Sequence, residues 1–196
     1  MSNELTSRRE MLRAAAIAVT VTGLDVEAAQ HVHNTAAEEK KTTGGVYKPK
    51  LFNAHEYKTL ASLAETIIPG ALQGGAPEFI DVLASQNDEL AAIFTGGLAW
   101  LDAEMKRRNK TSYLASQPAQ QTALLDLLAY RKNQTPELTH GVRFFEWMRR
   151  LTADAYYTSK AGIAELGYKG NGAVSEFKIP QEAYDYALKR SPFGNG

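Results

Sequence analysis

This chain has few residues that are candidates for catalysis or metal binding. His31 and His33 are spaced for metal contact on an extended chain, but two ligands in a polar segment make a weak metal site. Glu146 and Asp154 lie eight residues apart with arginines at helical spacing, which favours a salt-bridged helix surface over an acid and base pair. The sequence therefore predicts neither catalytic residues nor a metal site.

Composition excludes several classes of chemistry. The chain has 196 residues and no cysteine, so it forms no disulfide, thiolate metal site, iron–sulfur cluster or covalently attached c-type haem. It carries no glycine-rich dinucleotide fingerprint, phosphate-binding loop or Gly-x-Ser-x-Gly nucleophile turn. Its 22 basic and 22 acidic residues balance, which argues against a nucleic-acid partner. We expect no cofactor in this chain.

The first 29 residues have the features of an export signal. Arg8 and Arg9 precede a weakly apolar stretch over residues 14–24, and Val26 and Ala28 supply small residues for a cleavage site. The apolar stretch is too short for a membrane span, which needs about 20 residues. We predict a twin-arginine signal peptide over residues 1–29 and a periplasmic protein, unless the leader stays uncut as an anchor. The competing interpretation is an Ala-rich helix that begins a soluble domain.

The rest of the chain predicts helices. Residues 30–50 are polar and charged, so we expect a flexible linker there. From residue 51 onward, apolar residues repeat at three- and four-residue steps, and Asn53 with Glu56, Pro77 and Asn87 mark helix starts. The predicted fold is all-α: a disordered leader and linker, then a single-domain bundle of about six helices over residues 51–196.

The helix predicted to begin at residues 135–137 carries aromatic side chains on several of its faces. Phe144, Phe145 and Trp147 are followed by Tyr156 and Tyr157, and these side chains fall on more than one face. A helix of this kind must bury more than one face. It is either central to the bundle or shared with another protein, because clusters of exposed aromatic side chains mark interfaces.

Two stretches resemble the recurrent motifs of a known family. The first comprises residues 64–69 (AETIIP) with 75–81 (GAPEFID), and the second comprises 145–147 (FEW), 154–159 (DAYYTS), Gly162, 165–168 (ELGY) and 170–171 (GN). Together they resemble the gluconate 2-dehydrogenase subunit 3 family over about residues 51–168. A twin-arginine leader is typical of that family.

The resemblance implies a small, non-catalytic subunit of a flavin-dependent sugar or alcohol dehydrogenase complex. In such complexes a large subunit of the glucose–methanol–choline type holds FAD and the substrate, and a multihaem cytochrome c accepts the electrons. The small subunit carries the export signal, and its partner commonly lacks one. We therefore expect this chain to escort a flavoprotein through the twin-arginine translocase, to stabilise it, and to associate with the membrane through the complex.

The same resemblance directs attention to the aromatic residues as a contact surface. We hypothesise that they touch the flavoprotein or order the 158–171 loop that faces it: Phe144, Trp147, Tyr156, Tyr157 and Tyr168. Aromatic residues at helical spacing are more often core than interface, so each of them has that second interpretation.

Two other functions compete with the subunit hypothesis. A stand-alone periplasmic enzyme or ligand-binding protein would need a pocket built from His140, Glu146, Asp154 and the tyrosine pair. A structural module with a different protein partner would need only a surface. The substrate of any partner enzyme, its electron acceptor and the stoichiometry are outside what these residues predict.

Overall fold

The computed structural model describes residues 26–167 and 179–190. Within these ranges the chain is all-α, as predicted, with eight α-helices, two short 3-10 helices and no strand. Residues up to Leu166 belong to one compact unit, and Gly167 begins a second unit whose described helix is α9 (Gln181–Arg190). Arg8, Arg9 and Tyr168 lie outside the described residues. No described helix combines the length and the apolar character needed to cross a membrane.

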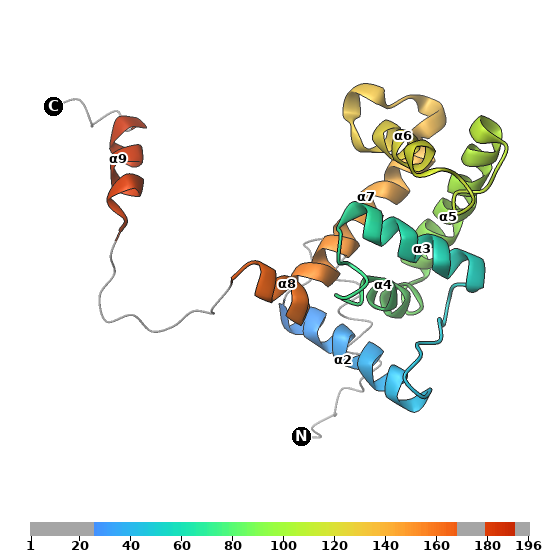
Figure 1. Cartoon of the computed structure of the whole chain (residues 1–196), viewed down its shortest axis with the longest axis horizontal. Helices are drawn as coiled ribbons and strands as arrows, with labels where there is room; N and C mark the ends of the chain where they lie inside the picture. Colours follow the sequence, from blue (N-terminus) through green and yellow to red (C-terminus); the bar gives the residue numbers. More distant parts are fainter. Residues whose placement is uncertain (1–25, 168–178, 191–196) are drawn as a thin grey trace, which may run out of the picture. The chain divides into compact units, whose positions relative to one another are not determined.

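Two helices form the centre of the bundle (Figure 1). Helix α4 (Ala76–Ala84) begins with Pro77, whose missing amide hydrogen is not needed there, and every residue of it except Glu78 is buried. Helix α7 (Thr139–Tyr157) contacts each of the other α-helices in this unit. This central position explains the rings of α7 that are buried, namely those of Phe144, Phe145 and Tyr156.

Four helices cover this centre, and their starts follow from local sequence. Helix α3 (Ala54–Ile67) has the predicted capping box, in which Asn53 accepts from the amides of His55 and Glu56 while Glu56 accepts from that of Asn53. Helix α5 (Asp88–Asn109) is capped by the Asn87 side chain. Helices α6 (Pro118–Ala129) and α8 (Lys160–Glu165) complete the cover, and 3-10 turns Arg131–Asn133 and Pro136–Leu138 join α6 to α7.

The structure differs from the prediction of a flexible linker over residues 30–50. Residues Val26–Thr42 form helix α2, which packs against α4 and α7 (Figure 1). Its inward face consists of only Ala29, Val32 and Ala36, all buried. So narrow an apolar stripe among many charged residues gives little sequence signal, although its three- and four-residue spacing is helical.

Hydrogen bonds and an ion pair fix α2 along its length. Near its start, the Gln30 amide donates to the carbonyl of Thr158 at 2.6 Å, and the His33 ring nitrogen lies 3.0 Å from the Thr158 hydroxyl. Near its end, Lys40 pairs with Glu78 of α4 at 2.6 Å. The His33 ring also packs on Phe79, and burial lowers the pKa of this histidine. His33 therefore has a packing role rather than a metal-binding one.

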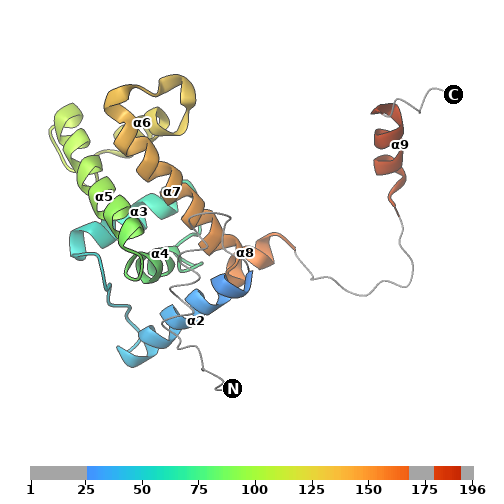
Figure 2. The ribbon, with the colours of Figure 1, turned by 180° about the vertical axis from the view of Figure 1, so that it is seen from behind.

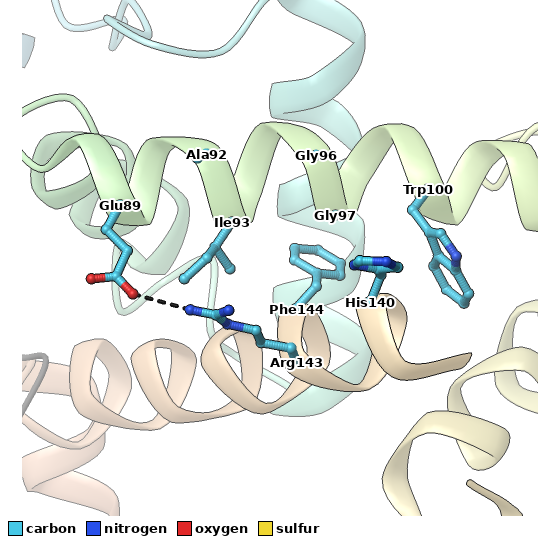
Figure 3. Close-up of a pocket in the computed structure, with 9 residues that line it drawn as sticks. All are labelled: Glu89, Ala92, Ile93, Gly96, Gly97, Trp100, His140, Arg143 and Phe144. Carbon is cyan, nitrogen blue, oxygen red and sulfur yellow. Dashed lines mark hydrogen bonds and ion pairs between the residues drawn. The ribbon is translucent and has the colours of Figure 1, made fainter. Parts of the chain in front are cut away.

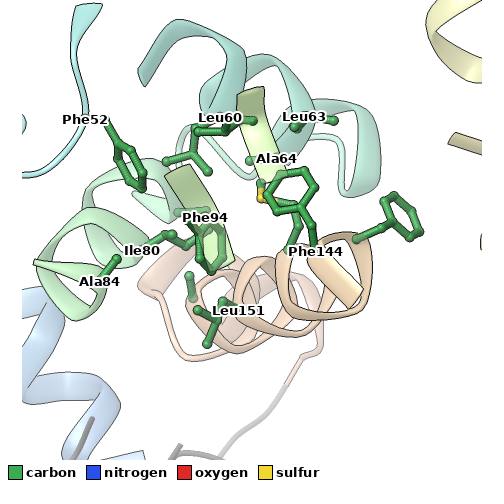
Figure 4. Packing of buried hydrophobic residues seen from close by; sticks show 14 of the residues in the cluster. Phe52, Leu60, Leu63, Ala64, Ile80, Ala84, Phe94, Phe144 and Leu151 are labelled. Carbon is green, nitrogen blue, oxygen red and sulfur yellow. The ribbon is translucent and has the colours of Figure 1, made fainter. Parts of the chain in front are cut away.

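A buried carboxylate organises the connection between α2 and α3. Asp81 of α4 is fully buried and accepts hydrogen bonds from the Tyr47 hydroxyl at 2.8 Å and from the backbone amides of Lys50 and Leu51 at 2.8 and 3.1 Å. Burial and the adjacent carboxylate raise the pKa of Tyr47, so its hydroxyl remains a donor. The chain is thereby held so that Phe52 enters the core beside Leu60 and Phe94 (Figure 4).

Replacing this carboxylate should destabilise the bundle strongly. Asp81→Ala leaves the buried Tyr47 hydroxyl and the backbone amides of residues 50–52 without this acceptor, and we expect the free energy of unfolding to fall by about 3 kcal/mol or more. Chemical denaturation followed by circular dichroism measures this. Asp126→Ala, the same change at an exposed position of α6, is the control and should alter stability by roughly 0.5 kcal/mol or less. A small effect at Asp81 would contradict its anchoring role.

Candidate partner interface

Tyr156, at the end of α7, joins three segments of the bundle. Its ring lies against Gly70 and Gly74 in the loop between α3 and α4. A Cβ on Gly74 would lie 2.8 Å from the ring, so the loop approaches this closely only because the residue is glycine. The Tyr156 hydroxyl donates to Glu165 of α8 at 2.6 Å, and this hydrogen bond raises the pKa of the tyrosine.

The segments around Tyr156 are themselves held in place. The Glu65 carboxylate accepts from the backbone amides of Gly70 and Leu72 at 2.9 and 3.1 Å, which orders the loop after α3. On the other side, Ser159 caps α8 by accepting from the amide of Gly162. A Cβ at Gly162 would lie 2.1 Å from the Tyr156 carbonyl oxygen, so only glycine permits this sharp turn from α7 into α8.

Exposed apolar side chains lie on the segments that meet at Tyr156. Tyr157 packs edge-on against Tyr156 with ring centroids 5.2 Å apart and is 42% exposed. Leu72 on the loop and Leu166 after α8 are 48% and 61% exposed. We call the exposed side chains of Leu72, Tyr157 and Leu166, with the buried Tyr156 between their segments, the Tyr156 surface. It presents apolar area to solvent on a backbone that glycine contacts and capping hydrogen bonds hold rigid.

The structure separates the aromatic residues that the sequence grouped as an interface. Phe144 is 1% exposed and meets Phe94 edge-on inside the bundle, so it is a core residue. Trp147 is half-buried against the core, with the Arg150 guanidinium 5.3 Å from its ring centroid. It lies about 14 Å from Tyr156 along the helix axis. Only Tyr156 and Tyr157 of the predicted set come together, and Tyr168 is outside the described residues.

Sequence reasoning missed the two leucines and two glutamates of this region. Leu72 and Leu166 are isolated apolar residues in turns, where no periodicity distinguishes them. Glu65 and Glu165 look like ordinary helix-surface charges. The glycines of residues 70–75 were the available signal, because clustered glycines between two helices also indicate close contact with another segment.

A concave region lies between α5 and α7, which run side by side (Figure 2). It is an open groove of about 400 Å³ lined chiefly by Ile93, Gly96, Trp100 and Phe144 (Figure 3). Arg143 crosses it to pair with Glu89 at 3.0 Å. The helices are close because Phe144 rests on Gly97, while Trp100 rests on Gly141.

The pocket required by a stand-alone enzyme does not form. His140 lines the groove between α5 and α7, whereas Asp154 lies about 21 Å further along α7. Burial raises the pKa of Asp154. Among the described residues, no three His, Asp or Glu side chains are placed to hold a metal ion.

A histidine–carboxylate pair that the sequence did not predict links α3 to α5. The His55 ring nitrogen lies 2.5 Å from one Asp102 oxygen, and the other oxygen accepts from the amide of Tyr113 at 2.8 Å. Both Asp102 oxygens are therefore engaged in joining segments of the bundle. We assign this pair a structural role.

Comparison with known proteins gives one match. A family model described as gluconate 2-dehydrogenase subunit 3 matches residues 54–174, more than half of the chain. No curated protein and no solved structure matches the chain. The matched range includes both segments that meet at Tyr156, namely the loop after α3 and the turn from α7 into α8.

The glycine contacts between α5 and α7 give a matched pair of substitutions. A Cβ at Gly97 would lie 2.2 Å from the Phe144 ring, whereas one at Gly96 meets no atom within 4 Å. Gly97→Ala should lower the free energy of unfolding by about 1–3 kcal/mol through overpacking. Gly96→Ala should raise it by roughly 0.5–1 kcal/mol through helix propensity. Thermal and urea unfolding measure both, and equal effects would contradict the close crossing.

Proposed function

This chain belongs to the gluconate 2-dehydrogenase subunit 3 family, and we propose that it is the non-catalytic small subunit of a periplasmic dehydrogenase complex. Its role is to bind, stabilise and export a flavoprotein of the glucose–methanol–choline type that oxidises a sugar, a sugar acid or an alcohol. FAD belongs to that partner and haem c to a third, cytochrome subunit. The complex, rather than this chain, makes the contact with the membrane.

The observation that carries the binding role is the Tyr156 surface. Two segments of the family match converge there, and these segments carry exposed leucine and tyrosine side chains. Tyrosine is enriched among residues that dominate binding energy, because it offers a large contact area and a hydroxyl at a low cost in side-chain entropy. A rigid backbone lowers the entropic cost further, since little has to be ordered when a partner binds.

The export role rests on the leader. Arg8 and Arg9 ahead of a weakly apolar stretch form the address that the twin-arginine translocase recognises. That route carries folded proteins, so a flavoprotein that has loaded FAD and bound this subunit can leave with it. A chain without a cofactor of its own then has a reason to use this route.

Binding is tested by purifying the C-terminally tagged chain from its native periplasm or membrane fraction. We expect a flavoprotein to co-purify in stoichiometric amount, identified by mass spectrometry and flavin absorbance. Tyr157→Ala should weaken the complex by on the order of 2 kcal/mol, about 30-fold in Kd, because an exposed aromatic anchor is lost. Tyr130→Ala, at a tyrosine that is 55% exposed outside the Tyr156 surface, is the matched control.

Two outcomes of that purification would count against the proposal. A colourless monomer would remove the subunit function and favour a ligand-binding protein, with the groove between α5 and α7 as its site. Equal affinities of the Tyr157 and Tyr130 variants would preserve the function but move the interface away from the Tyr156 surface.

Export is tested by changing the arginine pair. The double variant Arg8→Lys, Arg9→Lys should keep both this chain and the flavoprotein in the cytoplasm, because the pair is read by a receptor and lysine is not equivalent. Arg13→Lys, a conservative change in the same leader, should leave export intact. Cell fractionation with immunoblotting of both proteins provides the measurement. A flavoprotein that reaches the periplasm without the arginine pair would overturn the escort role.

A further inference from the structure

The start of α2 marks a sharp boundary between exposed and buried chain. Val26 is 65% exposed, Glu27 is exposed and Ala28 is half-buried, whereas Ala29 is fully buried. From Ala29 onward the helix is bound to the bundle, first through the hydrogen bond from Gln30 to Thr158. Burial therefore begins at Ala29, the last residue of the predicted leader.

Helix α2 contains two peptide bonds that are preceded by a small residue at the adjacent position and by another small residue two positions earlier. This is the pattern that leader peptidases recognise. One is Val26-Glu27-Ala28, before the bond to Ala29, and the other is Thr35-Ala36-Ala37, before the bond to Glu38. The sequence pattern alone does not choose between these two bonds.

The structure distinguishes them by the cost of exposing each bond to a peptidase. Proteases bind their substrates in an extended conformation, so the local helix must unwind first. Unwinding residues 26–28 affects one terminal turn, and helix ends open at little cost. Unwinding residues 35–37 in mid-helix withdraws Val32 and Ala36 from the core and separates Lys40 from Glu78.

We infer that the Ala28–Ala29 peptide bond is a proteolytic processing site, and that packing of α2 protects the Ala37–Glu38 bond. The inference rests on the export part of the proposed function. Water adds across the Ala28–Ala29 amide: Ala28 takes the carboxylate of the released leader, and Ala29 becomes a free α-amino terminus. The hydrogen bond from Gln30 and the buried Val32 side chain keep the shortened helix on the bundle.

The test treats the full chain, in detergent micelles, with the leader peptidase of the host, and reads the products by intact mass and N-terminal sequencing. We expect one product, beginning at Ala29. Ala28→Trp should reduce its formation at least tenfold, because the position before the cut bond accepts only small side chains. Glu27→Trp places the same bulk one residue earlier, at the unrestricted middle position, and should leave cleavage unchanged.

Loosening α2 tests the protective role of its packing. The double variant Gln30→Glu, Val32→Asn, which removes the hydrogen-bond donor and the apolar contact without adding a small residue, should give a second product that begins at Glu38, provided that circular dichroism shows the bundle still helical; if it is unfolded, Gln30→Glu alone replaces it. An uncut chain, a product that begins elsewhere, or equal cleavage of the two tryptophan variants would overturn the processing site. Absence of the Glu38 product would overturn the protective role.

This assay requires neither translocation nor a partner protein. If the chain is cut before Ala29 in micelles but no flavoprotein co-purifies with it from cells, the result would support the processing site and contradict the proposed function. A chain that reaches the periplasm with its flavoprotein while still uncut would contradict the processing site alone.

Discussion

The bundle depends on the buried carboxylate of Asp81. A carboxylate in an apolar interior is unstable unless hydrogen bonds replace its lost hydration, and here a tyrosine hydroxyl and three backbone amides provide them. Those donors all come from residues 47–52, in the connection between α2 and α3. Because Asp81 belongs to the most deeply buried helix, it ties the irregular connection to the centre of the core. The positions of α2 on one side and α3 on the other follow from this attachment.

Glycine contacts set the second level of organisation. At the crossing of α5 and α7, rings rest directly on Gly97 and Gly141, so the two helices approach more closely than any side chain would allow. At the end of α7, Gly74 and Gly162 let the loop after α3 and the start of α8 close around Tyr156. Close contact on glycine thus produces a packed core at the crossing of α5 and α7. At the end of α7 it produces a rigid turn whose outer residues remain exposed.

The sequence predicted most clearly what is decided locally. The capping pair of Asn53 and Glu56, the proline that begins α4 and the side-chain cap at Asn87 each depend on residues within one turn, and the structure has all three. What it did not predict depends on contacts between distant segments. Helix α2 has only three inward-facing residues, and their burial requires α4 and α7 to be in place. The roles of Phe144 and Tyr157 differ because of what lies opposite them, which a periodicity cannot reveal.

Thr158 connects helix α2 to the Tyr156 surface. Its carbonyl accepts from Gln30, its hydroxyl meets His33, and it directly follows Tyr157 in the chain. Any interaction that favours one conformation of residues 156–159 therefore also favours the docked state of α2, and thermodynamic linkage makes the effect reciprocal. In the proposed complex, a partner bound at the Tyr156 surface would therefore stabilise the docked α2, and a docked α2 would stabilise the surface. Partner binding and the docking of α2 would then be coupled through Thr158.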